Sequence, residues 1–270
     1  FFLELTSNNN LNNYYGDITN YEFLNSIPKS DYIIHSAGYA QPGKFMDDKL
    51  KTIAINTTST IALLKKLNTN GSFLFLSSSE VYSGSLNSHS NESDIGSTTP
   101  NHPRACYIEG KRTGEAIINA ARSNGIKAAS ARLALAYGPG VNKNDLRVLN
   151  QLIEKGIDGK IKLLDSGEAM RTYCYISDVV ISLCNILINN KFEVYNVGGE
   201  STLSIKDLAI IIGQQMSSPV EIPNTQPFLA SAPTSVELDL SRIENEYGMN
   251  HYIKLDYGLK KTIDWLRLCN

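Results

Sequence analysis

The chain has 270 residues, of which 42% are hydrophobic and 19% are charged, and its formal net charge is −2. This composition is typical of a globular protein, and without a basic surplus we expect no nucleic-acid partner. No apolar run approaches the length of a membrane-spanning helix, which is about 20 residues, so we expect no membrane contact.

Buried strands alternate with helices over residues 1–140. Apolar runs such as GSFLFLSSS are typical of strands covered on both faces. Such strands, separated by helices, predict a parallel, doubly wound sheet, which is an α/β fold of the Rossmann type. The predicted strands are FFLEL at residues 1–5 and residues 31–38, 71–79 and 126–134, and the predicted helices are residues 45–68 and 105–123.

The pattern changes after residue 140, and residues 141–270 predict a smaller, mixed, substrate-binding region. One of its helices, near 177–189, is expected to pack back on the first domain. Residues 87–103 are rich in Ser and Asn and predict a long loop, which in a compact domain is more often functional than not. The other elements predicted after residue 140 are a helix in LRVLNQLIEKG, strands near 161–164 and 193–196, and helices near 204–216 and 256–268.

Tyr107 and Lys111 are four residues apart in a predicted helix and therefore share one helix face. A free tyrosine has a pKa of about 10. A nearby ammonium group favours the phenolate, which could then take a proton near neutral pH. On its own the spacing also fits an exposed aromatic residue beside a solvated lysine. The residues SSSE at 77–80 end a predicted parallel strand, where ligands bind in such sheets.

A series of motifs resembles the extended short-chain dehydrogenase/reductase family, which comprises NAD-dependent nucleotide-sugar epimerases, dehydratases and decarboxylases. The motifs fall in the family's order and cover nearly the whole chain. They are YYGDITN, HSAGYAQP, INTTSTIALL with Ser59 in place of a glycine, SSSEVYSG, ARLALAYGPG, GEAMRTYCYISDVV and VYNVGGESTLSIKDLA.

The resemblance implies a catalytic role for four residues. Tyr107 would be the base that takes the proton of the sugar's C4 hydroxyl, with Lys111 as its partner and as a ligand of the cofactor ribose. Ser78 would hydrogen-bond the C4 hydroxyl, and Glu80 would be an acid/base at C5. All reactions of the family then begin with oxidation at C4 and pass through a 4-keto sugar.

The resemblance also implies binding residues for NAD and for a nucleotide-sugar substrate. Arg171 would contact the diphosphate of the substrate, since an arginine fork suits phosphate geometry. Asn56 would be mainly architectural. The remaining implied binding residues are Asp17 and Ile18 at the adenine of the cofactor, Ala37 and Gly38 beside its pyrophosphate, and Arg147 in the region that holds the nucleotide.

The segment PRACYIEGKRTGEAI is most similar to the UDP-glucuronate decarboxylase branch. Ser79 also fits this branch, because the 4,6-dehydratases have an acidic aspartate there. Two positions depart from it, since Leu135 replaces a substrate-facing asparagine and Val236 stands where the branch has an arginine. A nucleotide-sugar 4-epimerase, or a 4,6-dehydratase with unusual acid placement, therefore remains an alternative.

The family begins with a strand and a G-x-x-G-x-x-G loop that cradles the pyrophosphate at a helix N-terminus, and the chain shows neither. FFLEL resembles the family's second strand, so we expect the natural protein to have roughly 25–35 further residues, the size of one βα unit. Thr6, with Glu4 before it, aligns with the residue that selects between NAD and NADP, and NAD is favoured by the resemblance alone. The alternative of another class is a non-catalytic dinucleotide-binding scaffold.

The remaining expectations concern compartment, metal and assembly. The four cysteines show no C-x-x-C spacing and the four histidines are scattered, which favours reduced thiols in the cytoplasm and no metal site. The resemblance implies a homodimer in which the helices near 45–68 and 105–123 form a four-helix arrangement.

Overall fold

The computed structural model describes residues 11–87, 89–142, 145–224 and 237–269. FFLEL, with Glu4 and Thr6 in and after it, lies outside the described residues, and so does Val236. The largest sheet is parallel and four-stranded, and its strands in spatial order are β1 (Ser30–His35), β2 (Leu67–Ser78), β4 (Lys127–Leu133) and β8 (Val194–Val197).

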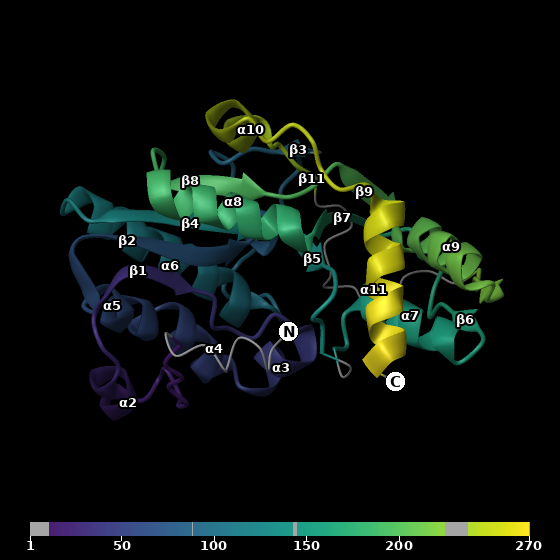
Figure 1. Cartoon of the computed structure of the whole chain (residues 1–270), viewed down its shortest axis with the longest axis horizontal. Coiled ribbons are helices and arrows are strands. Elements are labelled where there is room, and N and C mark those ends of the chain that lie inside the picture. The colour runs from purple at the N-terminus through teal and green to yellow at the C-terminus, as the bar shows by residue number, and fades with distance from the viewer. Residues whose placement is uncertain (1–10, 88, 143–144, 225–236, 270) are drawn as a thin grey trace.

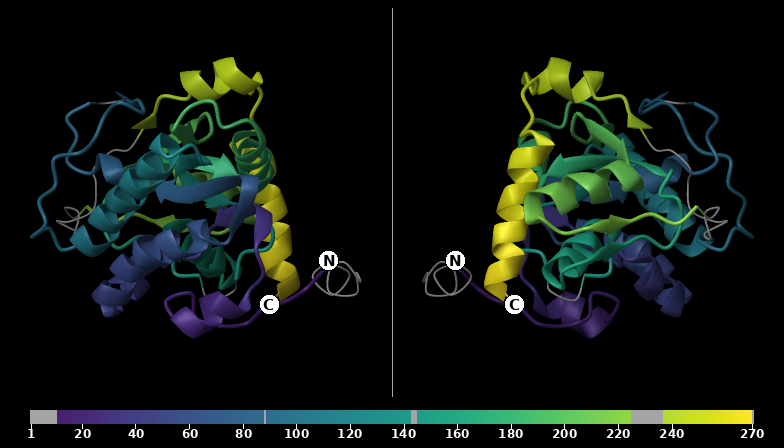
Figure 2. Two further views of the ribbon diagram at one scale, coloured as in Figure 1. Left: turned by 90° about the vertical axis from the view of Figure 1, so that its left-hand side faces the viewer. Right: turned by 90° about the vertical axis from the view of Figure 1, so that its right-hand side faces the viewer.

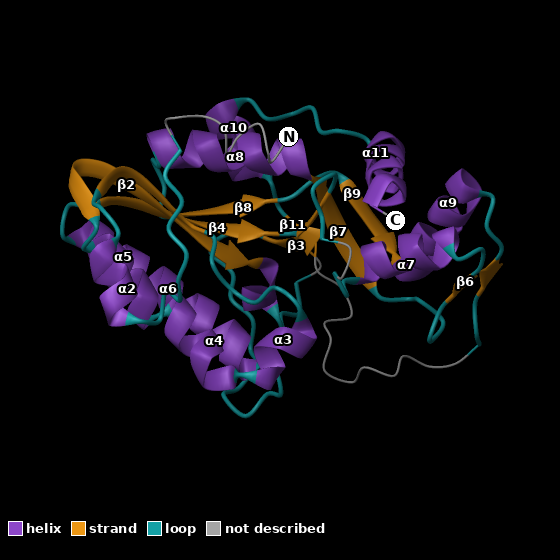
Figure 3. Ribbon diagram, turned by 60° about the horizontal axis from the view of Figure 1, so that its bottom comes forward, coloured by secondary structure: helices purple, strands orange, loops and turns teal. Residues whose placement is uncertain are grey.

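Helices cover both faces of this sheet (Figures 1 and 3). On one face α6 packs against β2 and β4, and on the other α8 packs against the same two strands. The parallel, doubly wound α/β fold predicted from the sequence is therefore confirmed. The helices of these two layers are α4 (Lys49–Asn56), α5 (Thr58–Leu64) and α6 (Ala105–Ser123) on one side and α8 (Ile176–Asn189) on the other.

The strand β8 lies beyond residue 140 in the sequence and yet completes the parallel sheet beside β4. The segments between and after these strands form a smaller region at one end of the molecule, around the sheet β5-β7-β9 (Figure 1). Its elements are β5 (Leu135–Tyr137), α7 (Val148–Ile157), β6 (Ile161–Lys162), β7 (Met170–Tyr175), β9 (Ser201–Ser204), α9 (Ile205–Met216), β10 (Val220–Glu221) and α11 (Leu255–Cys269).

The helix expected over residues 45–68 is divided into three pieces, α3 (Pro42–Asp47), α4 and α5, and its last residues already belong to β2. Asp48 separates the first two pieces because its carboxylate caps α4 through the N–H of Lys51. At the next break Thr57 leaves the helical region with φ −115° and ψ −80°. The hydroxyls of Thr57 and Thr58 bond carbonyls four residues back, a pattern that bends helices.

The helix α6 matches its predicted bounds and lies unusually close to β2. A Cβ added to Gly114 would lie 2.3 Å from Cζ of Phe75, so only glycine permits this approach. At the far end Gly125, with φ +82°, follows the C-cap Asn124 and stops the helix. The close approach fixes the first turns of α6 against the carboxyl end of β2.

The predicted loop at 87–103 is tied down at several points. Its short strand β3 (His89–Ser90) pairs with β11 (Glu237–Leu238), and the N–H of Gly96 donates to the carbonyl of Val81 at 2.9 Å. Figure 2 shows the segment on the side of the molecule opposite α11. The remaining short elements are α2 (Tyr21–Ser26), the 3₁₀ turn η1 (Ser79–Tyr82) and α10 (Ser241–Tyr247).

The core consists mainly of two apolar clusters on the two faces of the large sheet and a third between α7, α9 and α11. Phe73 and Phe75 are fully buried under α6, whereas Leu74 and Tyr195 are fully buried under α8. Alternate residues of β2 thus serve opposite faces, as expected for a strand with helices on both sides. Within the described ranges, no helix is both long and apolar enough to cross a membrane.

Candidate active site

Tyr107, Lys111 and Ser78 meet where β2 ends against the start of α6. Ser78 is the last residue of β2, and its hydroxyl also accepts the N–H of Glu80 at 3.2 Å. Tyr107 is buried and makes a hydrogen bond with Ser78. Nζ of Lys111 donates to the carbonyl of Leu76 at 2.7 Å and lies 5.7 Å from the centre of the Tyr107 ring. The structure therefore brings three of the four predicted catalytic residues together at the expected edge.

The protonation of this pair differs from the simple expectation. Burial raises the pKa of Tyr107, and the hydrogen bond with Ser78 and the charges of Arg104 and Arg147 only partly oppose this effect. Burial also lowers the pKa of Lys111 to about 7, although Glu115 acts in the opposite direction. In this structure desolvation therefore outweighs the attraction between ammonium and phenolate that the sequence suggested.

Glu80, the fourth predicted catalytic residue, lies in η1 and is paired with an arginine that the sequence reasoning did not single out. Nη2 of Arg104 donates to Oε1 of Glu80 at 2.6 Å, and both side chains are largely buried. The guanidinium of Arg104 lies 5.4 Å from the ring centre of Phe45. The Phe45 ring in turn stacks on Tyr107, with centres 4.7 Å apart and planes 12° apart. The pair thus belongs to the same site as the tyrosine.

The two predicted substrate arginines belong to the smaller region around the sheet β5-β7-β9. Arg147 caps α7 and is held by Asp145, whose carboxylate accepts from Nε and Nη2 at distances of 2.6 to 3.0 Å. Arg171 in β7 donates to the carbonyl of Met170 at 2.6 Å. Burial, followed by the like charge of Arg104, lowers the pKa of Arg171. Arg147 is therefore close enough to act on the charge of Tyr107, and Arg171 is close enough to be affected by Arg104.

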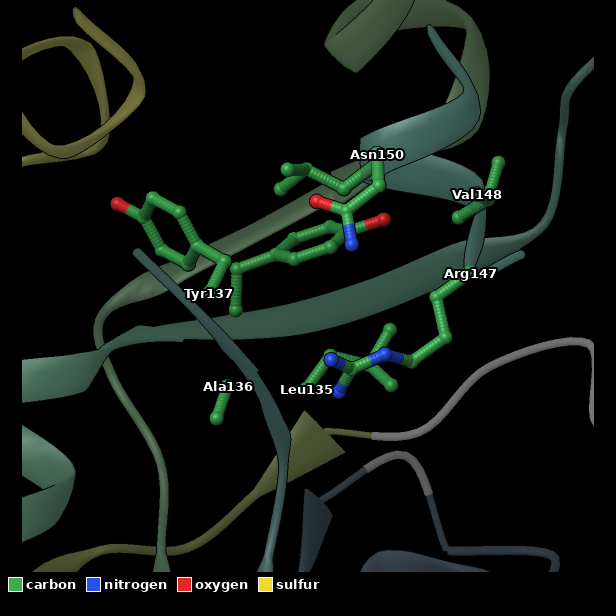
Figure 4. A pocket seen from close by; sticks show the side chains of 8 residues that line it. Leu135, Ala136, Tyr137, Arg147, Val148 and Asn150 are labelled. Atoms are coloured by element: carbon green, nitrogen blue, oxygen red, sulfur yellow. The ribbon is translucent and has the colours of Figure 1, made fainter. Parts of the chain in front are cut away.

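A pocket opens beside Arg147, between β5, β7 and α7. Figure 4 shows the Arg147 side chain extending toward Leu135, the residue that replaces the family's asparagine. The rings of Tyr137 and Tyr173 line this pocket, and their hydroxyls are buried without a hydrogen-bond partner in the described part of the chain, that of Tyr137 beside Gly258 of α11. The pocket is therefore small and mostly apolar, and its polar side chains include those of Arg147 and Asn150. Its lining consists of Leu135, Ala136, Tyr137, Arg147, Val148, Leu149, Asn150 and Tyr173.

The predicted cofactor residues lie on the β1 side of Lys111. Ala37 and Gly38 are exposed after the end of β1, and a Cβ added to Gly38 would lie 3.8 Å from Nζ of Lys111. Asp17 is exposed, and its carboxylate pairs with Lys51 at 2.6 Å, which with Thr19 lowers its pKa to about 2. The carbonyl of Ile18 accepts the hydroxyl of Ser59 at 2.9 Å. The serine that replaces the family's glycine thus anchors the segment that carries Asp17 and Ile18.

A second polar cluster, which we call the buried network, lies behind the strand end and was not foreseen. Glu115 follows Lys111 by one turn of α6 and receives Nε and Nη2 of Arg132 at 2.9 and 2.8 Å. The hydroxyl of Ser77 also donates to this carboxylate. Nη1 of Arg132 donates to the hydroxyl of Tyr82 at 2.8 Å and to two carbonyls of the 87–103 loop. The network therefore joins α6, the end of β2 and this loop.

Two signals in the sequence could have located these unforeseen residues. Tyr107, Lys111 and Glu115 follow one another at intervals of four, so the glutamate belongs to the same helix face as the pair that was singled out. Arg104 stands in the quoted PRACY segment, three residues before the tyrosine. Asn56, predicted to be architectural, sits at the α4–α5 break, where its Nδ2 donates to the carbonyl of Thr52.

The model of the NAD dependent epimerase/dehydratase family matches residues 4–198. The chain belongs to this family. The membership confirms the family resemblance drawn from the motifs, and it makes NAD the expected cofactor class of the fold.

Curated relatives carry the name of one branch. UDP-glucuronic acid decarboxylase 1 of Xenopus tropicalis is 32% identical over 243 residues, which make up 88% of this chain and 57% of the relative. The chain thus spans only a little over half of this relative's length.

Two solved structures share the fold. UDP-glucose 4-epimerase from Thermotoga maritima, solved with UDP-glucose, superposes with a TM-score of 0.83 at 21% identity, covering 94% of this chain and 84% of that one. A double mutant of a dTDP-glucose 4,6-dehydratase from Streptomyces venezuelae, solved with NAD, gives a TM-score of 0.81 at 20% identity, covering 98% and 82%. At this identity the likeness confirms the Rossmann-like fold alone.

The residues on the β1 side fit a dinucleotide. Ala37 and Gly38 have no bulky side chain, so a ligand can come close to the protein backbone at these two residues. Their neighbour Lys111 supplies a buried nitrogen at the same strand edge, and Lys51 lies within electrostatic reach of both Asp17 and Tyr39. The two predicted cofactor segments therefore lie near each other, at the carboxyl end of β1 where the fold binds ligands.

Proposed function

We propose that the chain is the catalytic part of an NAD-dependent enzyme that oxidises C4 of a nucleotide sugar, and that UDP-glucuronate is its substrate and decarboxylation its reaction. The observation that carries this proposal is the meeting of Tyr107, Ser78 and Lys111 at the carboxyl end of β2, beside Glu80. The curated relatives named UDP-glucuronic acid decarboxylase support the choice of substrate.

Tyr107 is the proposed base, and Ser78 positions the hydroxyl that it acts on. The serine already makes a hydrogen bond with the tyrosine, so a C4 hydroxyl placed against both would be aligned for proton transfer. Lys111, Ala37 and Gly38 would hold the cofactor on the β1 side. NAD, when bound, supplies the hydride acceptor, and the protein supplies position and charge.

The pKa of Tyr107 has to fall for this role, since burial raises it. The structure offers Arg104 and Arg147 as positive charges that act in this direction. Lys111, with its pKa lowered to about 7, can donate or accept a proton near neutral pH and so return the tyrosine to its starting state.

Arg171 and Arg147 are the proposed contacts to the nucleotide diphosphate. Arg171 is mostly buried, and the hydrogen bond found for it in the described residues goes to the backbone of its own neighbour. An anion would offer its guanidinium the charge-assisted bonds that it lacks.

Decarboxylation is favoured over dehydration by Ser79, which starts η1 and cannot act as the acid that expels a C6 hydroxyl. Once C4 is a ketone, the bond from C5 to a carboxylate can break with release of carbon dioxide, after which C5 takes a proton and return of the hydride to C4 gives the UDP-pentose. Glu80, which follows Ser78 by two residues in η1, is the proposed group for the proton at C5. Epimerisation at C4 needs the same first step and remains the second candidate, because Leu135 lines the pocket in place of asparagine.

The test is to incubate the full chain with NAD and each of UDP-glucuronate, UDP-glucose, UDP-N-acetylglucosamine and dTDP-glucose. We expect a UDP-pentose and carbon dioxide from UDP-glucuronate, with Tyr107→Phe as the inactive control. A C4 epimer would select the second candidate. If no sugar is turned over or reduces the cofactor, the non-catalytic scaffold replaces the enzyme.

We further propose that the protein is a cytoplasmic homodimer. Leu50 and Ile53 of α4 and Ile61 of α5 are exposed, by 81%, 40% and 45%, next to α6, which supports burial of this face in a four-helix arrangement. All four cysteines are free, which supports a reducing compartment. Sedimentation at micromolar concentration should give a dimer, and Leu50→Glu should give a monomer. A monomeric wild-type chain would contradict the assembly.

A further inference from the structure

Arg104 is only partly paired, although it is nearly buried. Its side chain is 12% exposed, and Nη2 donates to Glu80 at 2.6 Å. Nε is buried without a hydrogen-bond partner among the described residues. A buried donor of a charged group that lacks a partner costs free energy, so such groups are generally paired in the functional state. Arg104 therefore has a donor available for an acceptor that the chain itself does not provide.

The position of Arg104 is next to the proposed reaction centre. Its guanidinium packs on Phe45, and the same ring stacks on Tyr107 with ring centres 4.7 Å apart. The charge of Arg104 acts on both Tyr107 and Arg171. An acceptor that reaches Nε of Arg104 would therefore belong to a ligand that also lies beside Tyr107.

The charges around the site favour an anionic acceptor. Arg104, Arg147 and Arg171 contribute three positive charges, whereas Glu80 and Asp145 contribute two negative ones. Asp145 is engaged by Arg147 through both carboxylate oxygens. Glu80 is then the carboxylate that remains for Arg104, and it leaves Nε unpaired. A second carboxylate is the group that best matches the planar fork of a guanidinium.

We propose that Arg104 is the specificity-determining residue that binds the C6 carboxylate of a uronosyl nucleotide, with Glu80 on one side of its guanidinium and the substrate carboxylate on the other. This inference rests on the proposed function and assigns a residue to the charged end of the sugar. A neutral hexose would leave Nε unpaired in a buried position, and for that reason it would bind less well.

The test is a binding measurement and needs no turnover. The full chain is titrated calorimetrically with UDP, UDP-glucose and UDP-glucuronate, in the wild type and in Arg104→Gln, Arg104→Lys and Arg171→Ala. We expect Arg104→Gln to weaken UDP-glucuronate about tenfold or more, as for loss of a charge-assisted bond, and to change UDP and UDP-glucose less than threefold. Arg104→Lys should restore part of the loss, and Arg171→Ala should weaken all three ligands by similar factors.

A fourth variant keeps the test independent of the stability of the arginine variants. Glu80→Gln removes the competing carboxylate but not Arg104, and it should tighten UDP-glucuronate without affecting UDP-glucose. If Arg104→Gln lowers the affinity for UDP as much as that for UDP-glucuronate, the arginine binds the phosphates and the inference is wrong. If it changes no ligand, the arginine only holds Glu80, and the inference is also wrong. If the wild type binds none of the three ligands, the proposed function itself fails.

Discussion

Two arginine–glutamate pairs flank α6, and they differ in how completely the guanidinium is paired. In the buried network, all three nitrogens of Arg132 donate, two to Glu115 and one to Tyr82 and loop carbonyls. In the site, Arg104 donates to Glu80 through one nitrogen while another is buried and unpaired. Both pairs are shielded from water, so exposure does not explain the difference.

The contrast separates two uses of the same chemistry. A guanidinium whose donors are all used within the chain can fix elements relative to one another, and the buried network joins α6, β2 and the loop in this way. A guanidinium with a donor left over is poised for a ligand. Lys111 connects the two regions, since it lies beside Tyr107 in the site and one helical turn before Glu115 in the network.

The largest expected effect comes from opening the buried network. Arg132→Met leaves Glu115 as a buried carboxylate without its partner, and we expect a loss of about 3–5 kcal/mol in the free energy of unfolding. Urea unfolding measures it. The matched variant Arg104→Met should lose less, because it breaks one charge-assisted contact where Arg132→Met breaks several. Equal losses in the two variants would remove the distinction between the regions.

The next effect concerns the site alone. Tyr107→Phe deletes the proposed proton acceptor but keeps the ring that stacks on Phe45. We expect turnover of the true substrate to fall by about 10²-fold or more, with little change in the unfolding midpoint. Steady-state kinetics and a thermal melt of the same sample measure both quantities. Wild-type turnover in this variant would show that the tyrosine is not the base.

The third effect, which is the smallest when counted per pH unit, is a pH dependence at the residue that joins the regions. The pKa of Lys111 is lowered from 10.5 to about 7 in the folded chain, so between these values the unfolded chain binds a proton that the folded chain lacks. Folding stability should therefore rise with pH across this window, by up to about 1.4 kcal/mol per unit, and the cost of burying the charge is fully present below pH 7.

Lys111→Met isolates this contribution, because the variant cannot titrate there. Its stability relative to the wild type should be greatest at or below pH 7 and should decline steadily toward pH 9.5, as measured by urea unfolding at several pH values. A difference between the two proteins that is constant with pH would show that the lysine is not buried in the manner described.

Much of the fold could be predicted because its signals are local. The buried strand at 71–79 and the helix at 105–123 appear as β2 and α6, since apolar runs and helical periodicity are visible within a short window. The helix at 45–68 was predicted as one piece because its breaks depend on where hydroxyls bond, a choice that periodicity does not encode. The place of β8 beside β4 has no local signal, because it depends on contacts between residues as far apart in the sequence as Ser130 and Val194.

The site residues that could be predicted are those that belong to a recognisable sequence motif. Tyr107, Lys111 and Ser78 came from spacing and from the family resemblance, and the structure places them together. The direction of the pKa shift of Tyr107 was not predictable, because it depends on burial in three dimensions. Arg104 and Arg132 were missed for a related reason, since an arginine acquires its role from the carboxylate that the fold places beside it.

The anchored loop has a consequence for how the chain withstands proteases. A Ser- and Asn-rich stretch such as 87–103 is normally an easy cleavage site, because a protease must draw several residues into an extended form. Here Ser90 and Glu92 are buried, and the carbonyl of Ser90 accepts from Asp239, so cleavage between them would first require the local opening of the network around Arg132. Leu86, which is fully exposed, lies before these anchors. Nicking should therefore begin near Leu86, and its rate farther along the loop would report how often the interior of the protein opens.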